Sequence, residues 1–227
     1  MNIAVILSAG SGLRFNSADP KQFLLLNNKP IISHSVQKFQ ECQDVDKILI
    51  VSHPEHIKKT KDICAAFSKI AAVIEGGKRR QDSVLNGLEW IKKNEASCKV
   101  VFIHDSARPL FSKKLIGSLY DAVLKHGAVI PAIATDDTIK EKEASAVVKT
   151  LDREKLVRVQ TPQVFDFDKI YKAYSGFPKD KIATDDAFIV EFFGIKVNIV
   201  EGEKNNIKIT HPIDLKIAEL LIKEVVS

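Results

Sequence analysis

Two glycines and two cations near the start of the chain have the spacing of an anion-binding loop. Gly10 and Gly12 follow an apolar run from Ile3 to Leu7, and Arg14 and Lys21 come shortly afterwards. Glycine lets a ligand approach the backbone closely, and successive N–H groups in such a turn form a concave anion site. Arg14 would add a planar fork of donors and Lys21 a point charge. The stretch therefore predicts a polyphosphate site.

Two common glycine-loop motifs do not fit this stretch. The P-loop pattern G-x-x-x-x-G-K-[ST] occurs nowhere in the chain. A dinucleotide fingerprint needs a third glycine or alanine and an acidic residue after the second strand. Here the predicted second strand, Lys47 to Val51, runs into Ser52, His53 and Pro54, which disfavours hydride transfer. The remaining alternative is a glycine turn beside two surface cations that binds nothing.

Three later residues are candidate functional residues because of where they lie in the predicted strands and helices. Asp105 follows the apolar stretch Val100 to Ile103, where a carboxylate can hold Mg²⁺ or cap a turn. Lys208 lies in the apolar stretch Ile207 to Thr210, and a bound anion would account for a lysine inside a strand. Thr184 precedes two aspartates and is predicted to be a helix N-cap.

Strand and helix patterns alternate along the chain, which predicts an α/β fold. We expect one domain over residues 1–227, with a Rossmann-like, mostly parallel sheet and helices on both faces. The predicted strands are 3–7, 47–51, 70–74, 100–103, 128–133, 196–200 and 207–210. The predicted helices begin or run at 30–39, 54–67, 80–93, 112–125, 168–174, 184–193 and 212–226. Ligands of such sheets bind outside the carboxyl ends of the strands, where the residues above fall.

Residues 136–158 depart from this alternation. They are polar and charged, with short alternating stretches around Thr138 and Val147. The pattern predicts a hairpin outside the main sheet, which is either a solvent-exposed flap or an arm that reaches a partner.

Composition limits the classes of partner. The chain has 227 residues, a net charge of +5 and a pI near 9.0, which favours anionic ligands. Its basic clusters are short and lack interleaved aromatic residues, so nucleic acid is not expected. Three widely spaced cysteines predict a reducing compartment rather than a disulfide framework. His53 and His56 have no second ligand pair for zinc. No signal peptide or membrane span is predicted, so a soluble, cytoplasmic protein is expected.

The ordered set of motifs resembles one enzyme family. AVILSAGSGLRF followed by PKQF resembles the loop of nucleotidyltransferases that activate sugar or polyol phosphates. HDSARP, DTIK, DRxxL, TPQ, TDDA and NIKIT then resemble, in that order, the methylerythritol-phosphate cytidylyltransferases of non-mevalonate isoprenoid synthesis. The resemblance runs from residue 3 to about residue 215. It implies transfer of CMP from CTP to 2-C-methyl-D-erythritol 4-phosphate, release of pyrophosphate, and Mg²⁺ or another divalent cation as cofactor.

The resemblance also implies roles for individual residues. The expected catalytic cations, which hold the triphosphate and the transition state or lie near the reacting phosphates, are Arg14, Lys21 and Lys208. The expected nucleotide contacts are Ser8, Ala9, Gly10, Gly12, Gly77, Lys78, Ser83, Asp105 and Ser106, with Asp105 also on the metal. The expected contacts to the second substrate are Arg108, Thr138, Arg153 and Thr184. Thr138 and Arg153 would reach the site of the neighbouring subunit in a homodimer that exchanges its arms.

Two positions depart from the family pattern, and two alternatives stay open. Ser8 stands where alanine is usual, and Lys78 where an acidic residue is often found beside the base. Both positions would act largely through the backbone. The alternatives are a cytidylyltransferase that acts on ribitol phosphate and a non-catalytic nucleotide-binding module. The stretch from Asp152 to Gln163 favours methylerythritol phosphate, and the retention of Arg14 and Lys21 favours catalysis.

Overall fold

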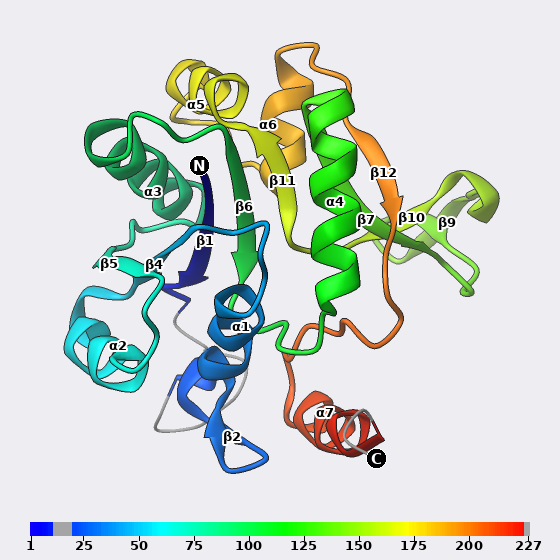
Figure 1. Ribbon diagram of the computed structural model, residues 1–227. Helices are drawn as coiled ribbons and strands as arrows, with labels where there is room; N and C mark the ends of the chain where they lie inside the picture. The colour runs from blue at the N-terminus through cyan, green and yellow to red at the C-terminus, as the bar shows by residue number, and fades with distance from the viewer. Residues whose placement is uncertain (11–19, 225–227) are drawn as a thin grey trace.

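One large sheet forms the centre of the structure, a computed structural model that describes residues 1–10 and 20–224. Its strand order is β10-β7-β11-β6-β1-β4-β5, and β12 pairs with β7 (Figure 1). These strands are β1 (Asn2–Ser8), β4 (Lys47–Ser52), β5 (Ile70–Glu75), β6 (Val100–Asp105), β7 (Ala128–Ala134), β10 (Val157–Val159), β11 (Gln163–Asp166) and β12 (Asn198–Glu201). Four pairings, β1 with β4 and β6, β4 with β5, and β7 with β12, are parallel. The predicted mostly parallel α/β sheet is confirmed.

The position of β1 inside the sheet explains why its sequence is continuously apolar. Ile3, Val5 and Leu7 belong to the core on one face of the sheet. Ala4 and Ile6, which alternate with them, belong to the core on the other face. Because both faces are covered by helices, a strand in this place has no polar side.

Helices cover both faces of the sheet, as the sequence predicts. One core contains side chains of α3 (Arg80–Asn94), α5 (Phe167–Gly176) and α6 (Asp186–Phe192). The opposite core contains side chains of α1 (Ile31–Gln40), α2 (Ile57–Cys64) and α4 (Lys113–His126). Ser112 caps α4 as expected, since its side chain accepts a hydrogen bond from the Leu115 N–H at 3.0 Å.

Three features at the carboxyl half of the chain differ from the prediction. Residues 157–159 form β10, which pairs with β7 in the main sheet, although residues 136–158 were expected to lie outside that sheet. Residues 207–210 do not form a strand; Ile209 is buried and its N–H donates to the Ala107 carbonyl. The alternation in this segment therefore reflects packing of a loop, not a pleat. Residues 163–166 form β11, which the sequence pattern did not predict, and this strand runs antiparallel between β6 and β7.

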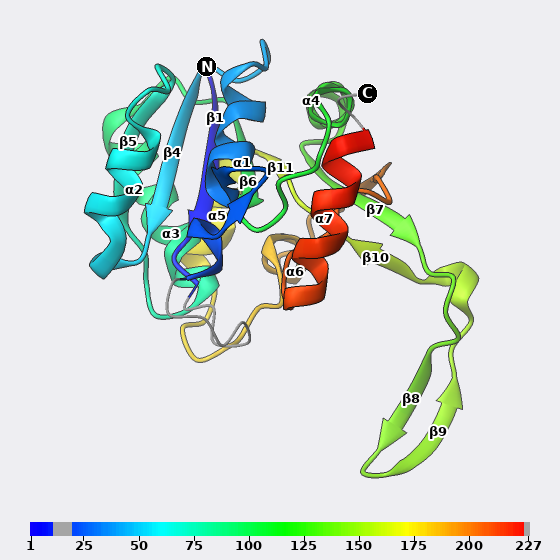
Figure 2. The same cartoon turned by 90° about the horizontal axis from the view of Figure 1, so that it is seen from below.

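The predicted hairpin is present and projects from the body of the molecule (Figure 2). It consists of β8 (Lys140–Glu143) and β9 (Ala146–Thr150), paired antiparallel, with Ala144 at a positive φ of 50° in the turn. All nine residues of the two strands are exposed, and Val147 is 64% exposed. We call residues 136–158 the arm.

A small apolar cluster packs beside the helix at the carboxyl end of the chain. The helix α7 (Pro212–Glu224) packs beside the short hairpin of β2 (Leu25–Leu26) and β3 (Lys29–Pro30). Their shared apolar cluster contains Leu26, Ile31, Ile209 and Ala218. Within the described part of the chain, no helix combines the length and hydropathy that crossing a membrane requires.

Candidate active site

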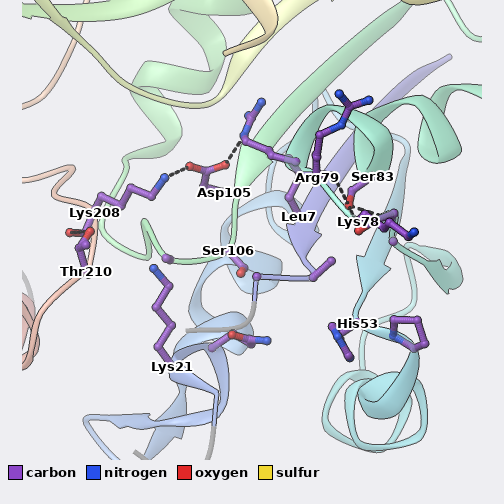
Figure 3. Close-up of a pocket in the computed structure, with 18 residues that line it drawn as sticks. Leu7, Lys21, His53, Lys78, Arg79, Ser83, Asp105, Ser106, Lys208 and Thr210 are labelled. Carbon is purple, nitrogen blue, oxygen red and sulfur yellow. Dashed lines mark hydrogen bonds and ion pairs between the residues drawn. The ribbon is translucent and has the colours of Figure 1, made fainter. Parts of the chain in front are cut away.

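A cavity of about 650 Å³ opens at the carboxyl ends of β1, β4, β5 and β6. It lies at the edge of the sheet where α/β proteins bind ligands. Its lining contains glycines that follow β1 and β5, the predicted cations Lys21 and Lys208, and the predicted carboxylate Asp105 (Figure 3). These predicted residues are Ala9, Gly10, Lys21, Gly77, Lys78, Ser83, Asp105, Ser106 and Lys208. The structure therefore brings nine of the predicted site residues to one cavity.

The Gly76–Gly77 turn forms one wall of the cavity, and its packing requires glycine. A Cβ on Gly77 would lie 2.4 Å from the Cβ of Asp82, and one on Gly76 would lie 2.5 Å from the Cβ of Ala9. The Gly77 N–H donates to the Ser83 hydroxyl at 3.0 Å. The turn is therefore held tightly against the start of α3 and against the first glycine stretch, which leaves its backbone groups at the cavity.

Lys21 reaches the cavity from the short 3-10 helix Lys21–Phe23. Its ammonium group donates to the Ile209 carbonyl at 3.0 Å. The neighbouring Gln22 amide donates to the Ser8 carbonyl at 3.0 Å and is itself buried. These bonds tie the segment that carries Lys21 both to the end of β1 and to the segment that carries Lys208.

Asp105 and Lys208 form an ion pair at the back of the cavity (Figure 3). The Lys208 ammonium lies 2.6 Å from Asp105 Oδ2, and the lysine side chain remains 40% exposed. A bound anion was expected because Lys208 was predicted to lie inside an apolar strand. That strand is absent, and the partner of Lys208 is the carboxylate of Asp105. The pair holds the ammonium at the cavity instead of letting it move through solvent.

Arg80 is the functional residue that the sequence pattern did not reveal. Its Nε donates to Asp105 Oδ1 at 3.1 Å, and its two terminal nitrogens donate to both oxygens of Asp186 at 2.9 and 2.7 Å. Burial alone would raise the pKa of Asp105, but Arg80 and Lys208 hold that pKa far below its ordinary value. Asp105 therefore stays ionised at any physiological pH.

The carboxylate of Asp186 anchors this arrangement in the core. Its side chain is fully buried and accepts a hydrogen bond from the Tyr174 hydroxyl at 2.5 Å. Burial, together with the charge of Asp186, raises the pKa of Tyr174 well above its ordinary value, so the phenol stays a donor. In sequence, Arg80 belongs to a run of three cations that is typical of a solvated surface, which is why its role was missed.

Behind Asp105, a buried histidine fixes the backbone. The Thr161 hydroxyl accepts from the Asp105 N–H at 3.1 Å and lies 3.1 Å from His104 Nδ1. His104 Nε2 lies 3.1 Å from the Arg108 carbonyl, so Nε2 carries the proton and Nδ1 accepts from Thr161. Burial lowers the pKa of His104 to about 3, and the ring is neutral. Thr161 is thus part of the support for Asp105.

Several predicted residues lie away from the cavity or outside the described residues. Gly12 and Arg14 fall within residues 11–19, which the structure does not describe. The substrate residues Thr138 and Arg153 are exposed on the arm, and Thr184 is exposed before α6. The N-cap of α6 is Asp185, not Thr184 as the sequence suggested, since Asp185 accepts from the Phe188 N–H.

Two further predicted residues are held by the fold instead of facing the cavity. Arg108 donates to the Asn206 carbonyl at 2.8 Å, and its Nε is buried without a partner. Ser8 is 2% exposed, and its hydroxyl also lacks a partner. Neither lines the cavity, so direct contact of these side chains with substrate is not part of this geometry.

Asp105 fits the coordination chemistry of Mg²⁺. It is the single carboxylate among the described residues that line the cavity. Mg²⁺ usually takes one or two carboxylates together with substrate phosphates and water, not a cage of protein ligands. Each oxygen of Asp105 has one protein donor, which leaves lone pairs for a cation that arrives with a triphosphate.

A cationic cavity at the carboxyl edge of a Rossmann-like sheet, lined by Gly10 and by the Gly76–Gly77 turn, has the character of a nucleotide-binding site, and the family match identifies its class as nucleotidyltransferase. The family described as IspD, 2-C-methyl-D-erythritol 4-phosphate cytidylyltransferase, matches residues 2–224. The protein of that name from Clostridium perfringens (strain SM101) is 42% identical over 225 residues, which cover 97% of this chain and 98% of the relative. The one from Alkaliphilus oremlandii is 40% identical over 224 residues, 96% of this chain and 94% of the relative.

Solved structures agree with the sequence relatives. The crystal structure of 4-diphosphocytidyl-2C-methyl-D-erythritol synthase from Anaerococcus prevotii superposes with a TM-score of 0.85 at 29% identity, and the match covers 98% of each chain. The chain belongs to the 2-C-methyl-D-erythritol 4-phosphate cytidylyltransferase family. The resemblance found in the motifs is confirmed.

Proposed function

We propose that this chain transfers CMP from CTP to 2-C-methyl-D-erythritol 4-phosphate in isoprenoid precursor synthesis. The products are CDP-methylerythritol and pyrophosphate. The observation that carries the proposal is the convergence of Lys21, Lys208 and Asp105 on one cavity, beside the Gly76–Gly77 turn, in a chain that matches this family over residues 2–224.

The reaction requires charge neutralisation more than proton transfer. A phosphate oxygen of methylerythritol phosphate forms a bond to the α-phosphorus of CTP while the bond to the β-phosphate oxygen breaks and pyrophosphate leaves. A phosphate monoester has a second pKa of about 6 and is mostly dianionic at pH 7, so no general base is needed. The barrier is repulsion between two polyanions, which cations aimed at the developing charge reduce.

The two lysines would supply this positive charge. We assign the triphosphate and the reacting phosphates to Lys21 and Lys208, with Arg14 assigned from the family pattern alone. The fixed Asp105–Lys208 pair keeps one ammonium in place before substrate arrives, so less reorganisation is needed during the reaction.

The glycine turn and its neighbours would hold the nucleoside. We assign the cytosine base to backbone groups near Ala9, Gly77 and Lys78 and to the Ser83 hydroxyl. Gly10, Asp105 and Ser106 would lie toward the ribose and phosphates. These groups are largely backbone, which fits a site that tolerates Ser8 and Lys78 where relatives of the family usually have other residues.

Asp105 would be the protein ligand of a divalent cation, Mg²⁺ in the first instance. A cation bound there with the triphosphate would offset phosphate charge and orient the leaving pyrophosphate. We expect the Mg²⁺ concentration needed for half-maximal rate to increase in Asp105→Asn. An unchanged Mg²⁺ dependence would exclude Asp105 as the ligand.

We further propose a homodimer in which each arm completes the site of the partner. The arm is exposed along both strands, and an isolated two-stranded hairpin is marginal in water. Its Thr138 and Arg153 do not line the cavity of their own chain. Pairing across a two-fold axis would cover Val147 and bring these residues to the neighbouring cavity, where they would hold the methylerythritol phosphate.

Mixing two inactive variants tests this arrangement. In a heterodimer of Lys21→Ala and Arg153→Ala chains, one shared site carries both defects and the other carries neither. Random exchange should restore about a quarter of wild-type sites, by counting over a two-fold dimer. If exchange is confirmed by mass and no activity returns, the shared site is wrong, and a monomer in solution would exclude the arm exchange.

A substrate panel tests the reaction itself. Pyrophosphate release from CTP should be rapid with methylerythritol phosphate and at least about a hundredfold slower with ribitol 5-phosphate, because a site built to pair substrate hydroxyls rejects poor matches. Faster turnover of ribitol phosphate would instead identify the chain as a cytidylyltransferase that acts on ribitol phosphate. Tight binding of CTP without any turnover would indicate a non-catalytic nucleotide-binding module.

We place this reaction in the cytoplasm, with neither nucleic acid nor membrane as a partner. Cys42, Cys64 and Cys98 are free and buried, which fits a reducing compartment. Expression of a tagged chain in its source cell, followed by fractionation, tests the location.

A further inference from the structure

Three neighbouring residues, one of which lines the cavity, have the chemistry of a transition-metal site and no part in the proposed reaction. His53 follows β4, and Glu55 and His56 lie in the 3-10 helix Pro54–His56. One possible ligand atom from each lies within 4.8 Å of the other two. His53 also lines the cavity (Figure 3). Two imidazoles and a carboxylate suit zinc-type cations, whereas Mg²⁺ prefers oxygen ligands alone.

One pair of possible ligand atoms lies near the spacing that such a cation needs, and the third lies within 4.8 Å of both. His53 Nδ1 lies 3.9 Å from Glu55 Oε2. Two ligand atoms of a tetrahedral zinc site, with bonds of about 2.0–2.1 Å, lie about 3.3 Å apart. The Glu55 side chain is 79% exposed, so rotation of this side chain can close the difference without moving the backbone.

The local fold holds both imidazoles close together. The His56 N–H donates to the His53 carbonyl at 2.9 Å, which closes the turn between them. Their ring centroids lie 5.5 Å apart. The His56 ring also packs edge to face against buried Phe23 at 5.5 Å, which restricts its rotation. The two histidines by themselves were not expected to bind zinc; the turn places Glu55 beside them as a third possible ligand.

We propose that His53, Glu55 and His56 form a site for one divalent transition cation of the zinc type, with a fourth coordination position left for water or another ligand. This site is separate from the Mg²⁺ position assigned to Asp105 and does not depend on the proposed reaction. The ammonium of Lys59 lies 4.8 Å from the centre of the Phe23 ring, so positive charge is already nearby. We therefore expect affinity on the order of micromolar, weaker than that of a closed structural zinc site.

Direct titration of the nucleotide-free protein with ZnCl₂ and with CoCl₂ tests the site. We expect one zinc per chain by calorimetry, and visible d–d absorption when Co²⁺ occupies the same site. His53→Ala, Glu55→Gln and His56→Ala should each weaken binding at least about tenfold, since even the loss of an outer partner of a metal ligand costs that much. His126→Ala, an exposed histidine in the last turn of α4, is the matched control and should bind as wild type. Thermal unfolding of each variant checks that it is folded.

Binding of the metal to a cysteine instead would give a different absorption spectrum. Burial raises the pKa of Cys64 and of Cys98 to about 12, so thiolate ligation is not expected. A strong thiolate-to-cobalt charge-transfer band would place the metal on a cysteine and overturn the proposal. It would also be overturned if wild type failed to bind Zn²⁺ below about 100 μM, a free energy of roughly 5.5 kcal/mol. Wild-type affinity in any of the three ligand variants would equally exclude the three-residue site.

Discussion

Among single residues, the proposed site holds two cations in fixed positions. Lys21 and Lys208 are both tied to named partners, the Ile209 carbonyl and Asp105, at 3.0 and 2.6 Å. Lysine side chains carry much rotational entropy, so a held ammonium contributes more to catalysis than a mobile one. The fixed ammonium groups are therefore the most direct targets for mutation.

Lys21→Ala should reduce kcat by about 10²–10³, the usual cost of removing one preorganised electrostatic donor. Its effect on the free energy of unfolding should be small, because the side chain is only partly buried. Steady-state pyrophosphate release and urea unfolding measure the two quantities. Lys78→Ala, at an exposed position of the same cavity, is the control and should retain most of the rate. Near-normal kcat in Lys21→Ala would remove its proposed role.

Arg80→Met should destabilise the fold by about 3–5 kcal/mol, because it leaves the fully buried Asp186 carboxylate without its ion-pair partner. Adding Asp186→Asn to Arg80→Met should recover part of that loss, since the unpaired charge is then gone. Urea unfolding of both single variants and the double variant gives the coupling between the two residues.

The matched control for Arg80 is Lys92→Met. Lys92 pairs with Asp168 at 3.9 Å, and both side chains are more than half exposed. Such surface pairs contribute about 0–1 kcal/mol. The role of the buried ion pair would be contradicted if Arg80→Met reduced the free energy of unfolding no more than Lys92→Met does. It would also be contradicted if the reductions caused by Arg80→Met and Asp186→Asn were additive in the double variant.

At the scale of elements, the sequence predicted most of the sheet and missed what depends on distant contacts. Buried parallel strands such as β1 are apolar on both faces and easy to recognise. The strand β11 was missed because Thr161-Pro162-Gln163 has the composition of a turn, and its pairing with β6 and β7 is set by residues far along the chain. The alternation of apolar and polar residues in 207–210 predicted a strand, but the structure has a loop there. The pattern arises because the loop buries one of its sides, not because it is pleated.

The same limit applies to the site. Gly10, Lys21, Asp105 and Lys208 could be identified from local patterns, the family resemblance added five further residues, and these nine meet at the cavity. The role of Arg80 could not, because nothing in the local sequence distinguishes it from Lys78 and Arg79. Its partners Asp105 and Asp186 lie 25 and 106 positions away along the chain.

Gly77→Ala tests whether the turn before α3 is held as tightly as the packing indicates. Its Cβ would meet the Asp82 Cβ at 2.4 Å and the Asp82 backbone at 3.0 Å. We expect a loss of about 1–3 kcal/mol in unfolding free energy from overpacking, and a higher KM for CTP as the turn shifts. Gly117→Ala, within α4, is the control: the atom nearest to the added Cβ is Asp44 Oδ2 at 3.8 Å, so the change should be neutral or stabilising by up to about 1 kcal/mol. Equal effects at the two positions would contradict the tight packing.

At the scale of the whole molecule, the buried neutral His104 makes stability depend on pH. Its pKa is about 3 in the folded state, against about 6.5 for an ordinary histidine. Below pH 6.5 the unfolded chain binds a proton that the folded chain does not, so stability falls as the pH decreases from about 6.5 toward 3. Between pH 7 and pH 4.5 this one residue should remove about 2–3 kcal/mol.

His104→Gln keeps a donor for the Arg108 carbonyl but does not titrate. The difference between its unfolding free energies at pH 7 and pH 4.5 should be smaller than that of wild type by the amount above. His126→Gln, at an exposed position, should keep the wild-type dependence. An identical pH dependence in wild type and His104→Gln would show that His104 does not remain neutral in the fold.

In the proposed reaction, this cavity joins two phosphates instead of hydrolysing one. The most direct measurement is ³¹P NMR of CTP and methylerythritol phosphate mixed with the protein and Mg²⁺. We expect the triphosphate and monoester signals to fall together, while one pyrophosphate signal and two mutually coupled signals of a diphosphate diester appear in equal amounts. The rate should fall about 10²–10³-fold in Lys21→Ala. Loss of CTP with an unchanged monoester signal, or no loss of CTP at all, would contradict the account.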